Sequence, residues 1–270
     1  MFNLCISNIA WSKDLDKTVY DLMKDNGFNY LEIAPTRIFD NPYFIKTDDL
    51  LSFKNEINSY GLNIVSMQSL IFNRPDLQLF ESDESRKDLK EILFKAIDFA
   101  SCLGIKNLVF GSPKNRIINN YEKDYPIAIS FFKEIGQYAL KKNTIVSLEA
   151  NASVYGTNFL TTTKQAYDFV KEVNNDGIRL QLDTGTMLIN NESVDSISSF
   201  VDMINHVHLS ELNLEVLSKS NFDFYKQLLK TLKLNNYSKV ISIEMKNTKL
   251  ENIENTIKFV KEIIEGIEND

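Results

Sequence analysis

The sequence predicts a single (β/α)8 TIM barrel that spans residues 1–270. Two observations point to this fold class: eight short apolar runs alternate with amphipathic stretches, and the long loops follow the apolar runs. The length of 270 residues is close to the about 250 residues typical of such barrels. A content of 43% hydrophobic and 25% charged residues is typical of a globular chain. Because no stretch is rich in Pro, Gly or Ser, we expect one domain without a linker.

The eight runs are rich in Val, Ile, Leu and aromatic residues, which are the residue types that favour strands. They cover residues 3–10, 30–34, 63–70, 107–110, 144–150, 178–183, 206–210 and 240–245. Between them, apolar residues recur at spacings of three and four, which predicts helices over 15–23, 50–60, 89–100 and 253–264. Gly27, Gly61 and Gly104 each stand two or three residues before the next run and are expected to end helices.

The loops have different lengths at the two ends of the predicted strands. The connections that lead into strands are short, whereas those that leave the third, fourth, fifth and seventh strands are long. In a barrel these long loops gather at the carboxyl ends of the strands, where active sites form. The alternative is an open, doubly wound sheet, but the first strand is followed by Trp-Ser-Lys-Asp at 11–14 and not by a glycine-rich turn.

The composition excludes several classes of protein. The net charge of -7 and the pI near 5.1 argue against nucleic-acid binding, which needs a basic face. Cys5 and Cys102 are too few for a disulfide framework and indicate thiols in a reducing compartment. No run of about 18 apolar residues predicts a membrane span, and the first residues lack the basic start of a secretion signal. We therefore expect a cytoplasmic protein.

Four of the predicted strands end in residues that can bind a metal ion. Glu149, Asp183, His208 and Glu244 come from the fifth to the eighth strands, and each follows an apolar residue. Ionised carboxylates on buried strands are costly unless they are paired or bound to a metal. On four consecutive strands of a closing barrel, the four side chains would converge. Three carboxylates and one imidazole favour Mn²⁺ or Mg²⁺ and also suit Co²⁺, Zn²⁺ or Fe²⁺.

Each of these residues also has an ordinary structural interpretation. A single carboxylate at a strand end often caps the following helix or pairs with a surface lysine. His206 and His208 share one face of their strand, because side chains repeat every two residues. His208 lies nearer the carboxyl end of the strand and is the better ligand, whereas His206 is expected to be a hydrogen-bonded interior residue.

The pattern resembles the xylose isomerase-like barrel superfamily of sugar isomerases and epimerases, which also contains apurinic endonucleases. The resemblance covers nearly the whole chain and includes Gly-Phe-Asn-Tyr-Leu-Glu-Ile at 27–33, which is similar to the second strand of the family. In its ketose 3-epimerase branch, a glutamate, an aspartate, a histidine and a second glutamate bind one divalent metal ion. By the match of motifs these residues are Glu149, Asp183, His208 and Glu244, and the resemblance implies that the two glutamates exchange the substrate proton.

The sequence departs from the family pattern at two places. The strand-six aspartate is often followed three residues later by a histidine, and Thr186 stands there in this chain. The endonuclease branch uses further histidines on the third and fourth strands for a three-metal cluster, but residues 65–68 and 109–112 contain none. With only two histidines in the chain, DNA repair is disfavoured.

Five other residues are candidates for substrate binding because they fall on the expected catalytic face. Lys114 and Arg116 lie in the loop Gly-Ser-Pro-Lys-Asn-Arg after the fourth strand and could hold an anionic group, or they could be solvated cations. Glu32 could bind the substrate, pair with Arg116 or form a structural salt bridge. Gln68 also lies on this face, and Trp11 could form an apolar wall under a sugar ring or pack in the core.

The leading expectation is a divalent-metal-dependent isomerase or epimerase of a small sugar or sugar phosphate. In this chemistry, a metal chelated by a carbonyl and a neighbouring hydroxyl acidifies the C–H bond and stabilises an enediolate. The alternatives are a dehydratase or lyase on a related polyol acid and a non-catalytic sugar-binding barrel, which the Thr186 departure keeps open. Relatives suggest a homodimer or homotetramer.

Overall fold

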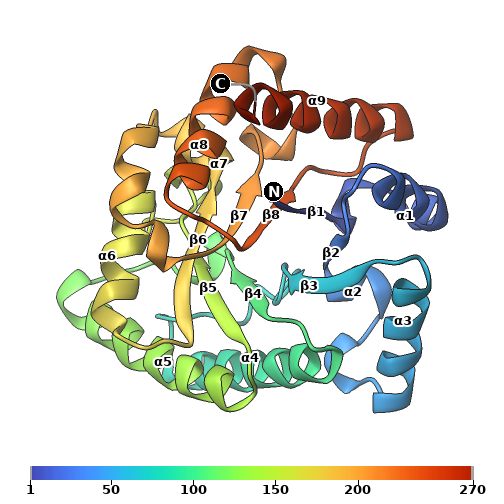
Figure 1. Cartoon of the computed structure of the whole chain (residues 1–270). Coiled ribbons are helices and arrows are strands. Elements are labelled where there is room, and N and C mark those ends of the chain that lie inside the picture. Colours follow the sequence, from blue (N-terminus) through green and yellow to red (C-terminus); the bar gives the residue numbers. More distant parts are fainter. Residues whose placement is uncertain (1, 269–270) are drawn as a thin grey trace.

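The computed structural model describes residues 2–268 and confirms the predicted barrel (Figure 1). Eight parallel strands form a closed ring in sequence order, and β1 pairs with β8 to close it. The strands are β1 (Asn3–Ser7), β2 (Tyr30–Ile33), β3 (Asn63–Met67), β4 (Asn107–Phe110), β5 (Ile145–Glu149), β6 (Ile178–Asp183), β7 (Ile204–Leu209) and β8 (Val240–Ile243).

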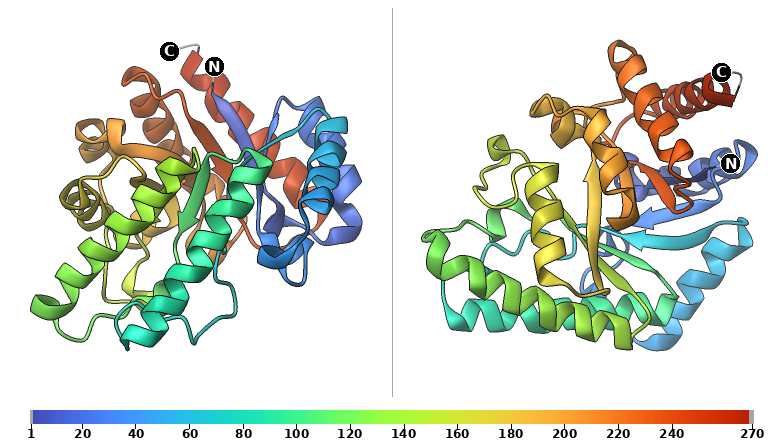
Figure 2. Two further views of the ribbon diagram at one scale, coloured as in Figure 1. Left: turned by 90° about the horizontal axis from the view of Figure 1, so that it is seen from below. Right: turned by 60° about the vertical axis from the view of Figure 1, so that its left-hand side comes forward.

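The α-helices lie outside the ring of strands, as the views in Figures 1 and 2 show. They are α1 (Asp16–Asp25), α2 (Pro35–Ile38), α3 (Thr47–Ser59), α4 (Asp83–Leu103), α5 (Tyr121–Lys141), α6 (Thr163–Val173), α7 (Thr184–Ile189), α8 (Phe222–Leu234) and α9 (Leu250–Glu268). Short 3-10 helices are η1 (Asn8–Ala10), η2 (Lys13–Leu15), η3 (Pro42–Phe44), η4 (Pro113–Asn115), η5 (Ser153–Tyr155), η6 (Val194–Ser199), η7 (Val201–Met203), η8 (Leu212–Leu214) and η9 (Lys219–Asn221). No helix within residues 2–268 combines the length and apolarity that a membrane crossing requires.

Some predicted strands are longer than the observed ones. The first was expected to reach residue 10, but β1 ends at Ser7 and the chain turns into η1. There the Asn8 side chain accepts a hydrogen bond from Ala34 N at 2.8 Å. This segment therefore bonds to the residue that follows β2 and does not extend the sheet. The short helices α2 and α7 were not predicted, because four to six residues are too few to show helical periodicity.

The long loops follow the strands that the sequence indicated. The connections between β3 and α4, β4 and α5, β5 and α6, and β7 and α8 are all long. At the opposite end of the barrel, α4 stops at Gly104, whose φ of 79° lies in the left-handed region that glycine adopts without steric cost. The long loops therefore lie together at the carboxyl ends of the strands, above the residues that end those strands.

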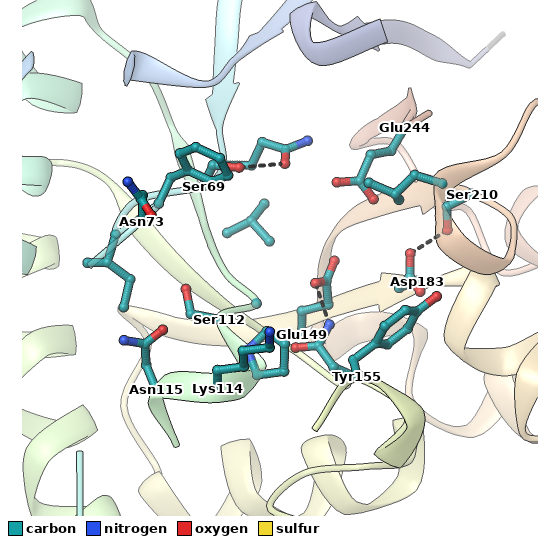
Figure 3. A pocket seen from close by; sticks show the side chains of 18 of the residues that line it. Ser69, Asn73, Ser112, Lys114, Asn115, Glu149, Tyr155, Asp183, Ser210 and Glu244 are labelled. Atoms are coloured by element: carbon teal, nitrogen blue, oxygen red, sulfur yellow. Dashed lines mark hydrogen bonds between the residues drawn. The ribbon is translucent and has the colours of Figure 1, made fainter. Parts of the chain in front are cut away.

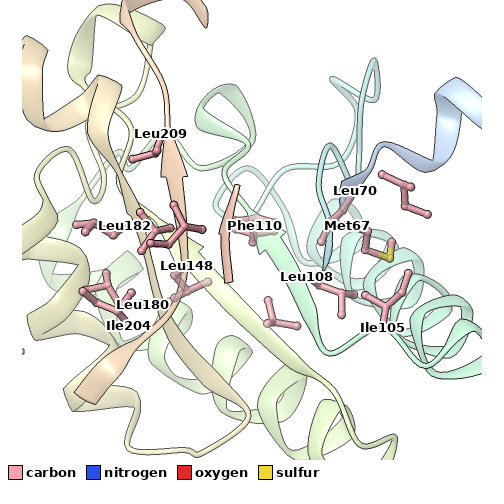
Figure 4. Close-up of a cluster of buried hydrophobic side chains, with 14 of the residues drawn as sticks. Met67, Leu70, Ile105, Leu108, Phe110, Leu148, Leu180, Leu182, Ile204 and Leu209 are labelled. Atoms are coloured by element: carbon pink, nitrogen blue, oxygen red, sulfur yellow. The ribbon is translucent and has the colours of Figure 1, made fainter. Parts of the chain in front are cut away.

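The main apolar core fills the layer between the strands and the helices (Figure 4). On β5 the fully buried Val146 and Leu148 alternate with Ser147 and Glu149, so that apolar and polar residues face opposite sides of the strand. Burying one leucine in this way contributes roughly 1.5–3 kcal/mol. The alternation places the polar residues inside the barrel.

Inside the barrel, hydrogen bonds join polar side chains on four neighbouring strands. The Ser147 hydroxyl donates to Asn107 Oδ1 at 2.5 Å, and Asn107 Nδ2 donates to Ser66 Oγ at 2.9 Å. The Ser66 hydroxyl then donates to Glu32 Oε2 at 2.7 Å. Since buried polar groups need partners, this chain of bonds fixes the Glu32 carboxylate beneath the candidate site.

Candidate metal centre and active site

The structure brings the four predicted metal ligands together at the carboxyl ends of β5 to β8. Glu149 ends β5, Asp183 ends β6, His208 lies in β7 and Glu244 directly follows β8. The register pairs Asp183 with His208 on neighbouring strands. One potential ligand atom from each of the four buried side chains lies within 4.8 Å of the others. Strand closure alone therefore assembles residues that are far apart in sequence.

The imidazole of His208 lies between the three glutamates and presents a different nitrogen to each side. Its Nδ1 is 3.0 Å from Glu149 Oε1 and 3.2 Å from Glu244 Oε2. Its Nε2 is 3.1 Å from both oxygens of Glu32. A proton on Nε2 donated to Glu32 would leave Nδ1 free to bind a cation on the side of Glu149 and Glu244.

Burial and repulsion between carboxylates strongly affect protonation in this cluster. Burial, together with the charges of Glu149 and Glu244, raises the pKa of Asp183 to about 7. Burial also raises the pKa of Glu244. Burial opposes a charge on His208, but Glu244 and Glu32 outweigh it and hold the pKa of His208 well above its usual value. Without a cation, the cluster therefore tends to retain protons that offset its negative charge.

These residues fit a divalent metal ion. Three carboxylates and one imidazole are oxygen-rich donors, and their mutual repulsion is relieved by a positive ion. A second group of potential ligands, Glu32, His206 and His208, is also buried. Neither Glu32 nor His206 lines the cavity, however, whereas Glu149, Asp183 and Glu244 do. A divalent ion that reached the cavity would therefore be held on the Glu149 side of His208.

His206 lies one layer deeper than His208 and is 1% exposed. Its Nε2 is 3.1 Å from Glu32 Oε2, but the alignment does not make a hydrogen bond, and this nitrogen has no other partner. The expected interior position is therefore seen, with the ring next to the Glu32 carboxylate. Burial lowers the pKa of His206, which favours a neutral ring beside Glu32.

Asp183 is both a member of the cluster and a helix cap. Its Oδ1 accepts from Thr186 N at 2.6 Å at the start of α7, and its Oδ2 accepts from the Ser210 hydroxyl. The Thr186 hydroxyl donates to Ala150 O at 3.0 Å. Thr186, which stands at the position of the family histidine, thus makes hydrogen bonds that hold the start of α7. Asp183 remains one of the four clustered potential ligands.

Glu149 is held in place on the side away from His208. Asn151 Nδ2 donates to Glu149 Oε2 at 2.9 Å, and Arg116 Nη2 donates to both Asn151 Oδ1 and Glu149 O at 2.7 Å. Gly111 leaves room for the carboxylate, because a Cβ at this position would lie 2.1 Å from Glu149 Oε2. These contacts set the orientation of Glu149 before any ligand binds.

The five predicted substrate-binding residues fall into different environments. Gln68 and Lys114 line a cavity of about 410 Å³ together with Glu149, Asp183 and Glu244 (Figure 3). Gln68 is anchored there, since its Nε2 donates to Ser7 Oγ at 2.9 Å and to Glu32 Oε1 at 3.2 Å.

The other three lie outside that cavity. Glu32 and Arg116 are fully buried and do not line it, and they do not pair with each other. Burial lowers the pKa of Arg116 to about 10, although the charge of Glu149 opposes the shift. Trp11 lines a second, adjoining cavity.

Sequence reasoning missed several residues of the cavity wall. Tyr155 lines the cavity, and its hydroxyl accepts a hydrogen bond from Asn213 N at 3.0 Å. This bond joins the loop after β5 to the loop after β7. Ser69 and Phe72, in the loop after β3, were also missed. The long loops were the only signal for these positions, because no residue pattern marks them.

Glu211 has a structural role, although it is among the cavity-lining residues. Its carboxylate accepts hydrogen bonds from the Tyr225 hydroxyl at 2.8 Å, Asn221 Nδ2 at 2.8 Å and Ser218 N at 2.9 Å. The carboxylate therefore braces the loop that follows β7.

Comparison with known proteins identifies the family. The profile of the family described as xylose isomerase-like TIM barrel matches residues 20–263, so the chain belongs to this family. No curated protein is similar enough in sequence to be matched.

Solved structures with the same fold include two sugar epimerases. A 3-keto-D-glucoside 4-epimerase from E. coli has a TM-score of 0.79 at 16% identity, and the alignment covers 98% of this chain and 100% of that one. A D-psicose 3-epimerase from Clostridium cellulolyticum H10, solved with D-tagatose, has a TM-score of 0.74 at 17% identity, with 99% of both chains covered.

A third structure of this fold contains a metal ion. It is the IolI protein with a bound zinc atom, which has a TM-score of 0.70 at 19% identity and covers 98% of both chains. At these identities the likeness shows the fold.

Proposed function

We propose that this protein is a divalent-metal-dependent isomerase or epimerase of a small sugar or sugar phosphate. The observation that carries the proposal is the position of Glu149 and Glu244. Both carboxylates line the same cavity, and both lie within 3.2 Å of His208 Nδ1. Two carboxylates at one cation site suit a reaction that removes a proton from carbon and returns it.

Glu149, Asp183, His208 and Glu244 would hold the metal ion. Such an ion, when bound, polarises a carbonyl and a neighbouring hydroxyl of the sugar and so acidifies the C–H bond between them. The identity of the ion stays a prediction: Mn²⁺ or Mg²⁺ first, then Co²⁺, Zn²⁺ or Fe²⁺.

The two glutamates move the proton. One carboxylate removes it from carbon, and the other delivers a proton to the opposite face, which inverts that centre. The hydrogen bond from Asn151 to Glu149 Oε2 keeps the carboxylate in position. The relatives solved as sugar epimerases support this class of reaction.

Lys114 gives the cavity a cation that could meet a phosphate group. It lines the cavity and is exposed, whereas Arg116 is buried beneath Glu149. If the substrate is a sugar phosphate, Lys114 and not Arg116 is therefore the residue that contacts the phosphate group.

The experiment is a screen for metal-dependent proton exchange. The Mn²⁺-loaded protein is incubated in D2O with ketoses, ketose phosphates and 3-keto-glucosides, and deuterium at carbon is followed by NMR. Glu149→Gln and Glu244→Gln should each abolish exchange, whereas the exposed Glu251→Gln control should not.

Three outcomes would contradict the proposal. Exchange that persists in either glutamate variant would refute the two-carboxylate mechanism. Failure to bind any of the divalent ions would favour a non-catalytic sugar-binding barrel. Loss of water from the substrate, seen by mass spectrometry, would indicate a dehydratase.

A further inference from the structure

A second cavity adjoins the one that contains the candidate metal ligands. The first has a volume of about 410 Å³ and the second about 480 Å³, and Ser69 and Phe72 line both. The second cavity is bounded by Trp11 and Ala34, which follow β1 and β2, and by Asn247, which follows β8. Both cavities therefore open at the carboxyl ends of the strands, and a single ligand could extend from one into the other.

The lining of the second cavity suits a neutral polyhydroxyl group. Trp11 is 1% exposed and donates its indole N–H to Asp16 at 2.8 Å, so it supports this cavity from the core, and the exposed apolar surface of the cavity comes from Phe72. Ser12, Thr36 and Asn247 add hydroxyl and amide groups. None of the lining residues, as far as the structure describes the chain, is acidic, in contrast to the carboxylate-rich first cavity.

The cations of the second cavity do not form a ready phosphate site. The Arg37 guanidinium donates from Nη2 to Asp16 at 2.6 Å and to Trp11 O at 3.1 Å, and the carboxylate of Asp16 offsets its charge. Lys13 is exposed on a short 3-10 helix. A single exposed lysine attracts an anion only weakly, and it lacks the bidentate geometry with which arginine holds a phosphate.

Phe72 stands at the junction of the two cavities with 68% of its surface exposed. Large exposed aromatic side chains in a cavity wall commonly contact a ligand, because burying the ring removes apolar surface from water. The backbone on both sides of Phe72 is unusual, since Ser69 and Asn73 have φ of 55° and 57°. Non-glycine residues in the left-handed region cost free energy and are found at ligand-binding segments.

From these observations we infer that the substrate is a glycoside with two rings. The sugar that reacts lies in the cavity with Glu149 and Glu244, and the second sugar ring lies in the adjoining cavity beside Phe72, within reach of Thr36 and Asn247. This inference rests on the proposed function and adds the substrate class to it. A free monosaccharide would leave the second cavity unused.

The test compares ligands that differ by one ring. D-Fructose is the single-ring probe, and isomaltulose and lactulose are the two-ring probes, because both keep a free fructose carbonyl next to hydroxyl groups. Binding to the Mn²⁺-loaded full chain is measured by calorimetry. We expect at least one disaccharide to bind about tenfold more tightly than D-fructose, which is the gain expected from one further stacked ring.

Three variants test which residues produce the tighter binding of the disaccharide. Phe72→Ala should abolish the tenfold difference in affinity between the disaccharide and D-fructose. Thr36→Trp, at an exposed position in the wall of the second cavity, should block binding of the disaccharide while D-fructose still binds. Phe44→Ala is the matched control, because Phe44 is 70% exposed but lines neither cavity. This control should leave the tenfold ratio intact.

The outcomes separate this inference from the proposed function. Metal-dependent binding of D-fructose without any gain for either disaccharide would overturn the two-ring substrate and leave the proposed function standing. Tighter binding of fructose 6-phosphate than of both disaccharides, lost in Lys13→Ala, would overturn it in favour of a phosphate site. If no sugar binds in a metal-dependent manner, the proposed function fails, and the two-ring substrate fails with it.

Discussion

The carboxylate of Glu32 and the imidazole of His208 meet inside the barrel, with both oxygens of Glu32 at 3.1 Å from His208 Nε2. Burial opposes a charge on Glu32, but His208 and His206 outweigh it and hold the pKa of Glu32 well below its usual value. Glu32 therefore stays ionised and orients the ring, so that Nδ1 faces the two glutamates of the cavity. This contact suits Glu32 to position His208, and the substrate-binding role considered for Glu32 stays a prediction.

The first prediction concerns this contact. Glu32→Gln removes the charge that fixes the proton on His208 Nε2, and we expect the affinity for Mn²⁺ to fall by about 10- to 100-fold. Calorimetric titration of the purified variant measures the change, and circular dichroism checks that the barrel is intact. Glu81→Gln, at an exposed position, is the control. An unchanged affinity would show that Glu32 does not orient the metal ligand.

The second prediction concerns the space beside Glu149. Gly111→Ala places a Cβ where Glu149 Oε2 now lies, and the carboxylate must rotate away from both the alanine and Asn151. Because the clash is with the end of a side chain, the barrel should fold while metal affinity and proton exchange fall at least about tenfold.

The control for this substitution is Gly266→Ala in α9. A Cβ at Gly266 would meet only the Lys226 side chain, 3.7 Å away. Alanine favours helix, so this variant should be as stable as the parent or more so, with unchanged metal affinity. Equal metal affinity in the two alanine variants would contradict the role assigned to Gly111.

The third prediction separates Arg116 from Lys114, which the sequence analysis treated as a pair. Arg116→Met leaves Asn151 Oδ1 and Glu149 O without their buried donor, so the free energy of unfolding should fall by about 1–3 kcal/mol. Lys114→Met should leave stability within about 0.5 kcal/mol, because the side chain is exposed.

Two measurements test this separation. Chemical denaturation compares the stability of both variants, and ketose phosphate binding compares their affinity. Lys114→Met should weaken binding of a ketose phosphate but not of the free ketose. If Arg116→Met were as stable as the parent and lost only phosphate binding, Arg116 would be a substrate ligand, as first expected.

The barrel and the four metal ligands could be predicted from the sequence because both depend on strands. Alternating burial marks a strand locally, and parallel pairing brings the ends of strands together without further information. The strand limits at 107–110 and 178–183 agree with β4 and β6. Glu149 and Asp183 could thus be placed from their positions at the ends of β5 and β6 alone.

The environments of the other site residues could not be predicted in the same way. Arg116 and Lys114 are two residues apart in one loop, yet one is fully buried and the other is exposed. A loop has no fixed side-chain period, so spacing does not show which residue points inward. Glu32 lies on a strand, but its partner His208 is 176 residues away, and the contact depends on the barrel interior.

The fourth prediction concerns the pH dependence of metal binding. Burial, with the charges of Glu149 and Glu244, raises the pKa of Asp183 to about 7 in the metal-free protein. A cation must displace that proton as well as the one on His208, whose pKa is also raised, so the affinity for Mn²⁺ should rise between pH 5.5 and 7.5; the Asp183 proton alone contributes up to about tenfold per pH unit below its pKa.

The raised pKa of Asp183 also affects the metal-free protein, whose stability should fall with rising pH while the metal affinity rises. The folded state binds the Asp183 proton more tightly than the unfolded state does, so this group lowers the free energy of unfolding as pH rises from about 4 to about 7. Mn²⁺ should therefore raise the Tm more at pH 7.5 than at pH 5.5, and the difference should shrink in Asp183→Asn. Thermal unfolding with and without Mn²⁺ measures both effects. A Tm shift that is the same at the two pH values in the parent protein would show that Asp183 holds no proton for the metal to displace.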